Sequence, residues 1–294
     1  MNITTNMQTQ NNLTYKGEIK SLNAINPISY YTNRYFKKSA RISNKNFTPI
    51  SDALNGKINK IKLDNISAWD INPEKTDNYV LFLHGMSQNV SNYQPLYETV
   101  LKHKKAVFAV EYRNYGENAP ARMSEDKLRK DIVKAYKYLT ETKNIKPENI
   151  IVMGHSMGGA LATDFASKHK DIKSLILFSP IKDMASIGKK FFANKSIGVG
   201  IPPKVSKFSE KIKPLIWLLR QRFNSVKKMS KVEAPTYILQ SKNDSVTLLD
   251  GTRKLAKIAR EKGILKDFIL FPLGGHKVDS KKVEAVNKIL EEIG

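Results

Sequence analysis

The sequence contains no cysteine, which excludes disulfide bonds, thiol nucleophiles and thiolate metal sites. It has no run of about eighteen or more apolar residues, so no transmembrane helix is expected. The polar residues 1–6 lack the apolar segment that a secretory signal requires. These absences predict a cytoplasmic protein, and a chain of 294 residues is long enough for one large domain with a substantial core.

Acidic residues are also scarce, because 27 Asp and Glu stand against 50 Lys and Arg and give a net charge of +23. Lysine outnumbers arginine 41 to 9, and asparagine and isoleucine are abundant. Codon bias in an AT-rich genome produces such a composition without selection for anion binding. The sequence has neither an aromatic-basic nucleic-acid module nor a phosphate-binding P-loop, so no specific nucleic-acid partner is expected.

The most informative motif is the sequence Gly-His-Ser-Met-Gly-Gly at residues 154–159. It follows an apolar, β-branched run at 150–153 and precedes a helical pattern, which together predict a strand, a tight turn and a helix. A serine on such a strained turn needs neighbours without side chains, and Gly154 and Gly158 meet that need. The pattern predicts a nucleophile elbow in which Ser156 attacks the substrate.

A serine hydroxyl is a poor nucleophile unless a base and an orienting carboxylate accompany it. Asp244 follows a predicted strand at 235–241, and His276 follows a predicted strand at 266–271 on a Gly-Gly loop. The chain order of serine, aspartate and histidine is the one that this type of elbow requires. We predict that His276 is the base and that Asp244 orients its ring.

Two other carboxylates compete with Asp244 for the role of the acid. Asp183 follows the preceding predicted strand, and it would suit an enzyme that carries the acid one strand earlier. Asp250 is better explained as the cap of a helix that begins at or just before Thr252, because an aspartate satisfies free amides at a helix start.

The sequence has only five histidines, so elimination narrows the choice of the base. His103 and His169 lie among lysines at predicted helix ends, where solvent exposure is expected. His155 occupies the variable position of the elbow and is expected to point away from the nucleophile. His84 belongs to a separate loop, which leaves His276.

A second backbone donor for an oxyanion hole is expected from the loop after the predicted strand at 79–83. This loop reads His84-Gly85-Met86, and Gly85 lets it turn close to the elbow. The predicted donors are the main-chain amides of Met86 and Met157, the latter directly after the nucleophile. His84 is expected to brace this loop through hydrogen bonds. Whether the side chains of Ser87 and Gln88 add a third donor stays open.

These residues resemble the α/β-hydrolase superfamily of serine hydrolases, in particular its serine aminopeptidase, monoacylglycerol-lipase-like and Bem46-like branch. The resemblance covers residues 60–294 and rests on the loop at 84–85, the segment Glu-Tyr-Arg-Asn-Tyr-Gly at 111–116, and the predicted triad. It implies a mostly parallel central sheet with helices on both faces and an inserted helical cap. Glu111 and Asn114 depart from the branch, which usually has aspartate and glycine at these positions.

Strand and helix patterns alternate after residue 57, as a parallel sheet covered by helices requires. Strands are predicted at 57–63, 66–71, 79–83, 106–111, 149–154, 173–179, 235–241 and 266–271. Helices are predicted at 92–103, 125–142, 157–169, 251–262 and 279–292. Residues 1–45 are predicted to form a flexible polar extension with a short docking helix at 30–38, and the catalytic core is assigned to 46–182 and 231–294.

Residues 183–230 separate two central strands by far more chain than a direct connection needs, which predicts an inserted cap. The segment holds eleven Lys and Arg against two acids, and its aromatic residues include Phe191, Phe192, Trp217 and Phe223. An apolar lining with a basic rim suits acyl chains and an anionic head group or membrane surface. The alternative, that these aromatic residues form core and the lysines are simply solvated, stays open.

Together these features predict a serine hydrolase that cleaves carboxylic esters of apolar acyl groups through an acyl-enzyme, without a metal or organic cofactor. One alternative is a serine aminopeptidase, which needs a carboxylate in the cap to bind the substrate ammonium. Another is a non-catalytic α/β-hydrolase that binds a hydrophobic ligand or a partner protein.

Overall fold

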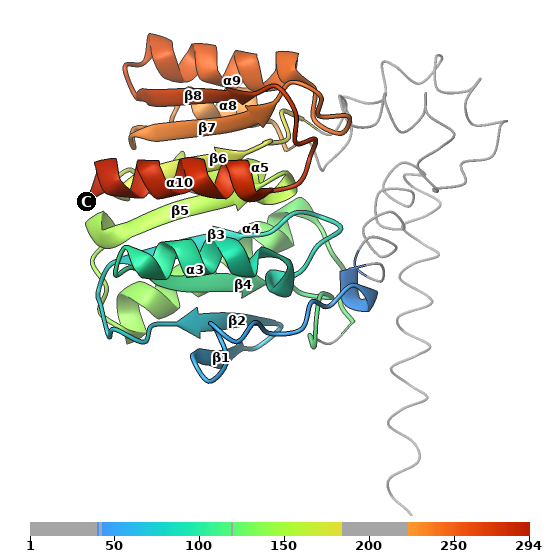
Figure 1. The fold of residues 1–294 in the computed structure, drawn as a ribbon, viewed down its shortest axis with the longest axis vertical. Helices are drawn as coiled ribbons and strands as arrows, with labels where there is room; N and C mark the ends of the chain where they lie inside the picture. The colour runs from blue at the N-terminus through green and yellow to red at the C-terminus, as the bar shows by residue number, and fades with distance from the viewer. Residues whose placement is uncertain (1–39, 41–42, 119, 184–222) are drawn as a thin grey trace, which may run out of the picture.

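The computed structural model describes residue 40 and residues 43–118, 120–183 and 223–294. Within these ranges the chain forms one eight-stranded sheet with the order β1-β2-β4-β3-β5-β6-β7-β8 (Figure 1). The strands are β1 (Ile58–Leu63), β2 (Ile66–Ile71), β3 (Tyr79–Leu83), β4 (Ala106–Glu111), β5 (Ile150–His155), β6 (Ser174–Phe178), β7 (Thr236–Ser241) and β8 (Leu265–Phe271).

Strands β3 to β8 are parallel, and β1 and β2 join them in antiparallel pairs. All residues of β3, β4, β5, β6 and β7 are buried, as expected for parallel strands that are covered on both faces. Their near-continuous apolar sequences follow from that burial. The parallel arrangement also brings the ends of β3, β5, β7 and β8, and the loops after them, to one edge of the sheet.

The helices cover both faces of the sheet. On one face, α3 (Gln94–Lys102) packs beside α10 (Ser280–Ile293) (Figure 1). The opposite face buries apolar side chains of α4 (Glu125–Lys137), α5 (Met157–Ala166), α8 (Ser225–Met229) and α9 (Leu249–Glu261). Shorter turns of helix are η1 (Val90–Tyr93), η2 (Tyr138–Thr142) and η3 (Pro147–Asn149).

Side-chain alternation along the strands divides the apolar residues between two core clusters. Leu81 and Leu83 of β3 belong to the cluster under α4, α5 and α9, whereas Val80 and Phe82 belong to the cluster under α3 and α10. This division follows from the two-residue period of a strand. Each predicted strand and each of the five predicted helices has a counterpart in the structure, with shifts at the ends.

Two helix predictions need correction. α9 begins at Leu249 with Leu248 as its N-cap, so Asp250 is not the cap and instead lies in the first turn, where its charge still complements the helix dipole. The predicted helix at 125–142 ends as an α-helix at Lys137 and continues as one π-helical turn over Tyr138–Thr142.

The last residues of the predicted cap, from Phe223 onward, pack into the core. Phe223 is only 1% exposed and belongs to the main core cluster, so the prediction that its side chain lines a cap is wrong. Its main-chain amide donates to the buried carboxylate of Glu125 at 2.9 Å. α8 follows directly and packs against α5 and α9. The predicted aromatic cap residues Phe191, Phe192 and Trp217 lie outside the described residues.

Part of the predicted N-terminal extension also contacts the core. The Asn89 side chain donates to the Ser43 carbonyl at 2.8 Å, and the Gly116 amide donates to the Asn44 side chain at 2.8 Å. The predicted docking helix at 30–38 lies outside the described residues. In the part of the chain that the structure describes, no helix is long and apolar enough to cross a membrane.

The close packing of α5 on β3 gives a test of the fold. A Cβ at Gly158 would lie 2.0 Å from the carbonyl oxygen of Leu83, and both atoms belong to backbones that other elements hold. Gly158→Ala is expected to destabilise the protein by about 3 kcal/mol or more in urea unfolding. Gly56→Ala is the control, because Gly56 has a φ of +72° and nothing within 4 Å of an added Cβ; it should cost only about 1–2 kcal/mol. Equal losses for the two variants would contradict the packing argument.

Candidate active site

Ser156 lies on a strained turn between β5 and α5. Its backbone has φ 56° and ψ −113°, a conformation that few residues with a side chain adopt and that persists only where the surroundings impose it. The Ser156 amide donates to the Phe178 carbonyl at 2.9 Å, and the Ser156 carbonyl accepts from the Ile181 amide at 3.1 Å. A Cβ at Gly154 would lie 2.4 Å from the Gly158 carbonyl oxygen, so the turn is too tight for a side chain there.

The structure brings the three predicted triad residues together in one hydrogen-bonded chain. His276 Nε2 is 2.9 Å from Ser156 Oγ, and His276 Nδ1 is 2.9 Å from Asp244 Oδ2. The Asp244 side chain is fully buried, whereas the His276 side chain keeps 21% of its surface exposed. Since Nδ1 faces a carboxylate, the ring presents a bare Nε2 to the serine hydroxyl when it is neutral.

Asp244 is held as a carboxylate by a dense set of donors. The amides of Val246 and Thr247 donate to Oδ1 at 2.8 and 2.9 Å, and the Thr247 hydroxyl donates to Oδ2 at 2.8 Å. The Gln240 side chain donates to Oδ2 at 3.2 Å. Burial alone would raise the pKa of this carboxyl, but the hydrogen bonds with His276 and Thr247 hold the pKa well below its usual range.

The other carboxylates and histidines that the sequence offered as members of the triad have partners outside the Ser156 site. Asp183 forms an ion pair with Lys182 at 3.2 Å, and the carboxylate that contacts the His276 ring is that of Asp244. His169 and His103 are half-buried, so the expectation that they are simply solvated is wrong. The His169 ring stacks on Phe165 with 4.0 Å between ring centroids, and His103 Nε2 is 2.9 Å from an asparagine oxygen of α10.

The loop after β3 lies against the serine turn. A Cβ at Gly85 would lie 3.4 Å from Ser156 Cβ and 3.0 Å from His155 Nδ1. The Met86 carbonyl accepts from the Tyr115 hydroxyl at 2.5 Å. Met157 is the first residue of α5, so its amide has no acceptor within the helix. The two predicted oxyanion donors therefore belong to segments that meet beside the serine.

His84 is fully buried beneath this loop. Its Nδ1 is 2.8 Å from the Gly85 carbonyl oxygen, and its Nε2 is 3.0 Å from Glu111 Oε1. Glu111 Oε2 in turn accepts from the Val90 amide at 3.3 Å. The His84 ring also packs on Tyr112, with centroids 4.2 Å apart. These contacts indicate that His84 holds the loop in place. They also give Glu111, which stands where the branch usually has aspartate, a partner in His84.

The sequence alone does not reveal the contacts of His155. The side chain is buried, and its Nε2 is 2.7 Å from the main-chain carbonyl oxygen of His276. Its Nδ1 is 2.8 Å from the Tyr93 hydroxyl. Burial and the neighbouring His276 lower the pKa of His155 well below its usual value, so the ring is neutral. Its partners are 62 and 121 residues away in the sequence, which explains why no local pattern indicates them.

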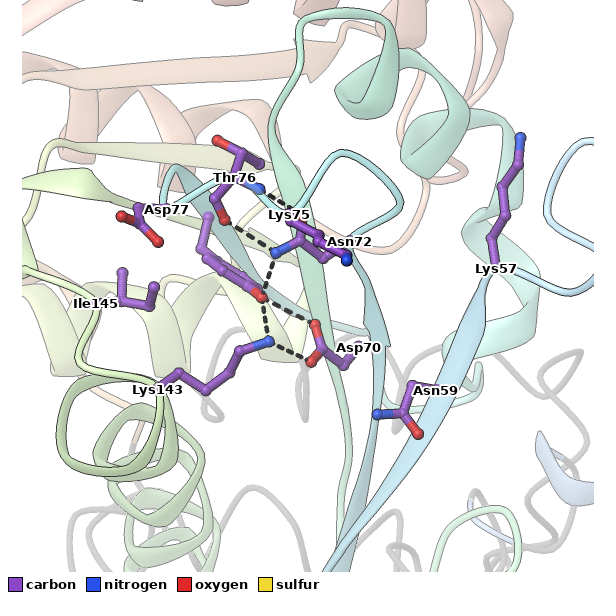
Figure 2. A pocket seen from close by; sticks show the side chains of 10 residues that line it. Lys57, Asn59, Asp70, Asn72, Lys75, Thr76, Asp77, Lys143 and Ile145 are labelled. Carbon is purple, nitrogen blue, oxygen red and sulfur yellow. Dashed lines mark hydrogen bonds and ion pairs between the residues drawn. The ribbon is translucent and has the colours of Figure 1, made fainter.

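A pocket lies at the other end of the sheet, near the start of β3. It has a volume of about 400 Å³. Figure 2 shows that the side chains of Asp70 and Lys143, which line this pocket, point toward one another. Asp70 accepts from Lys143 at 2.6 Å and from Tyr79 at 3.2 Å, and Lys143 also contacts the Tyr79 hydroxyl. Because these groups satisfy each other, we place the candidate chemistry at the serine site. Among the described residues, no group of three or more His, Asp or Glu side chains is arranged to hold a metal ion.

Solved structures share this fold. A Vibrio vulnificus α/β-hydrolase superposes with a TM-score of 0.69 at 20% identity, covering 90% of this chain and 94% of its own. A Pyrococcus furiosus esterase superposes with a TM-score of 0.62 at 20% identity, covering 81% and 93%. The chain therefore has the α/β-hydrolase fold that its motifs imply.

The family follows from the sequence. The model of the serine aminopeptidase S33 family matches residues 74–226, which is more than half of the chain, and the protein belongs to this family. An uncharacterised Mycobacterium tuberculosis protein is 26% identical over 192 residues, 64% of this chain and 60% of the relative. The α/β-hydrolase domain-containing protein WAV2 of Arabidopsis thaliana is 25% identical over 220 residues, 72% and 68%. This chain thus spans about 60% of the length of the Mycobacterium relative.

The neutral state of His155 makes the stability of the protein depend on pH. Below pH of about 6.5, the unfolded chain binds a proton at this histidine that the folded protein excludes, so the free energy of unfolding decreases as the pH falls. His155→Gln removes this contribution. Between pH 7 and 5, the stability of the wild type relative to the variant should fall by about 2 kcal/mol in urea titrations. His169 contributes the same pH dependence to the wild type and to the variant, so its effect cancels in the difference. Parallel pH dependences would contradict a neutral, buried His155.

Proposed function

We propose that this protein is a serine hydrolase that cleaves carboxylic esters through an acyl-enzyme. The observation that carries the proposal is the chain of two 2.9 Å contacts from Ser156 through His276 to Asp244. A strained serine at a helix start, a partly exposed imidazole and a buried carboxylate are the parts that nucleophilic acyl transfer needs. The similarity in fold to the Pyrococcus furiosus esterase supports the choice of ester chemistry.

In the proposed cycle, Ser156 Oγ attacks the ester carbonyl carbon while neutral His276 takes the hydroxyl proton at Nε2. The carbon–oxygen bond to the alcohol then breaks, and the alcohol leaves with that proton. Water attacks the acyl-enzyme, again losing a proton to His276, and releases the acid and free Ser156. Asp244 fixes the ring and stabilises its cationic form. The amides of Met86 and Met157 stabilise the negative charge on the carbonyl oxygen.

Apolar residues beside the catalytic loops favour an apolar acyl or alkyl group. Leu248 is 45% exposed and follows the Asp244 loop, and Leu273 is 66% exposed and precedes His276. Exposed leucines near a polar site offer surface that an apolar substrate would cover. The net charge of +23 does not itself select an ester, because the ester group carries no charge.

The first test concerns the nucleophile. Ser156→Ala should reduce kcat for p-nitrophenyl butyrate by about 10⁴-fold or more, because only binding and oxyanion stabilisation remain. Ser230→Ala, at an exposed serine after α8 whose hydroxyl donates to the Lys227 carbonyl at 2.9 Å, is the control and should retain most activity. A Ser156→Ala protein that keeps more than about a tenth of wild-type kcat would exclude Ser156 as the nucleophile. Faster turnover of leucyl p-nitroanilide than of the ester would favour the aminopeptidase alternative.

The second test separates the two candidate acids. Asp244→Asn should lower kcat by about 10³- to 10⁴-fold, because the imidazole loses the partner that sets its tautomer. Asp183→Asn should change kcat by no more than about threefold, since Asp183 pairs with Lys182. The reverse ranking of the two variants in steady-state kinetics would move the acid to the loop after β6.

The third test concerns the acyl group. With p-nitrophenyl esters of increasing length, kcat/KM should rise about fourfold for each added methylene until the apolar surface is filled. The double variant Leu248→Ser, Leu273→Ser should weaken this dependence while acetate hydrolysis persists. Ile50→Ser is the matched control, because Ile50 is also exposed, at 40%, but lies far from the catalytic loops in sequence. An unchanged chain-length dependence in the double variant would place the acyl group elsewhere.

A further inference from the structure

Lys282 is a buried lysine in the first turn of α10, and its side chain has no exposed surface. Its ammonium donates to the main-chain carbonyls of Gly275 at 3.3 Å and Lys277 at 2.6 Å. Its ion pair with Asp279 is long, at 3.9 Å. Burial lowers the pKa of the ammonium, because a buried site disfavours the charged form. A buried charge without a close counter-ion is costly to stability, so the contacts of the Lys282 ammonium with this loop need an explanation.

The carbonyl between these two belongs to His276, and it accepts from His155 Nε2 at 2.7 Å. Three consecutive carbonyl oxygens, of residues 275, 276 and 277, are therefore held by two buried side chains. One side chain comes from α10 and the other from the end of β5, directly beside Ser156. We call this arrangement the carbonyl clamp.

The hydrogen bonds of His155 fix its tautomer. A carbonyl oxygen only accepts, so Nε2 carries the proton, and the bare Nδ1 of the neutral ring accepts from the Tyr93 hydroxyl. The Tyr93 oxygen also accepts from the Gly85 amide at 3.0 Å. Gln88 Oε1 is 2.5 Å from the same oxygen. Because the single Tyr93 proton points to His155, this contact requires the Gln88 amide to be turned by 180°, so that its NH₂ group donates. The clamp is thus continuous with the loop that carries Met86.

The loop needs such restraints because its backbone is permissive. Gly274 has φ 121° and Gly275 has φ 58°. Glycine adopts such conformations readily, but its backbone also has more conformations available to it than other residues have, so the loop alone would not hold one position. The Gly275 amide donates to the Asn243 side chain at 2.9 Å, which fixes only the loop before the histidine. A shift of about 1 Å in a catalytic group is enough to slow a reaction by about 10²-fold.

We propose that Lys282 and His155 are positioning residues, which hold the main chain around His276 so that its ring bridges Ser156 and Asp244. This inference rests on the proposed function for its catalytic consequence. Neither side chain hydrogen-bonds with the reacting atoms, and the His155 ring also packs against the His276 ring with 4.8 Å between centroids. They act through three carbonyl groups, and the buried charge of Lys282 is retained for that purpose at the expense of stability.

The main test compares two adjacent lysines of α10 in the full chain. Lys282→Met removes the ammonium and keeps an unbranched apolar chain, and kcat for p-nitrophenyl butyrate should fall about 10²-fold with KM nearly unchanged. Its Tm should stay equal to that of the wild type or rise, because a buried charge is lost. Lys281→Met removes the same charge from an exposed position and should leave kcat unchanged. Wild-type kcat in Lys282→Met, or a loss of kcat that parallels a lower Tm, would overturn the proposal.

His155 allows rescue by a conservative substitution. His155→Leu removes the donor to the His276 carbonyl and should lower kcat by about 10-fold or more. His155→Gln places an amide nitrogen near the position of Nε2, and it should recover most of the loss without restoring the contact with Tyr93. Equal activities of the two variants would show that the hydrogen bond to the carbonyl has no role.

Hydrogen exchange gives a readout that does not depend on catalysis. In the inactive Ser156→Ala background, Lys282→Met should speed amide exchange in residues 274–278, whereas Lys281→Met should not. If the wild type hydrolysed no ester and resisted serine-directed probes, the proposed function would fail. The exchange result would still decide on the clamp, because unchanged exchange in Lys282→Met overturns it and faster exchange confined to the loop supports it.

Discussion

The turn that carries Ser156 and the end of β3 touch through their backbones, with no side chain between them. Gly158 faces the Leu83 carbonyl so closely that a Cβ there would lie 2.0 Å from that oxygen. This contact sets the distance between the first turn of α5 and the loop that begins at His84. Ser156, the start of α5 and the loop that contains Gly85 and Met86 are thereby brought together, because parallel strands end at the same edge of the sheet. The strain at Ser156 is sustained by that packing.

His276, the proposed base, lies on a different loop from Ser156, and its position depends on polar contacts more than on apolar packing. β8 is an edge strand whose residues are partly exposed, and the loop after it contains two glycines with positive φ. Buried polar side chains hold this loop where a core strand cannot. Asp244 holds the His276 ring at Nδ1, and the carbonyl clamp is proposed to hold its main chain. Buried polar groups of this kind stabilise one arrangement only when each of them is satisfied.

Local pattern predicts most of the fold and the triad. The strands are short apolar runs between turn residues, and α5 and α10 follow from apolar periodicity, so the sequence alone is enough to place them. Ser156 and His276 are indicated by glycines whose function is local, and Asp244 by its place after β7. The structure adds a direct contact of Asp244 with the His276 ring that distinguishes it from Asp183.

Contacts between distant segments account for what the sequence does not reveal. In the sequence, His155 is only the variable residue of the elbow motif, and Lys282 is one of several lysines in a helix. Their roles are not apparent locally, because their partners lie on another loop. The basic residues around Phe223 suggest that it belongs to the cap. Its side chain is instead buried in the core, and its main-chain amide donates to Glu125. Asp250 is a residue type that commonly caps helices, but α9 starts at Leu249 with Leu248 as its N-cap, two residues earlier than a cap at Asp250 would place it. Such choices depend on tertiary packing, which overrides local preference.

The central claim is that Ser156 is an activated nucleophile in the folded protein, and covalent labelling measures this directly. Native protein is treated with a fluorophosphonate, digested, and mapped by mass spectrometry, beside a urea-unfolded sample and Ser156→Ala. The account predicts one adduct per chain, on the peptide that contains Ser156, and none in the unfolded sample or the variant. An unlabelled native protein with intact circular dichroism, or an adduct on a different serine, would contradict it.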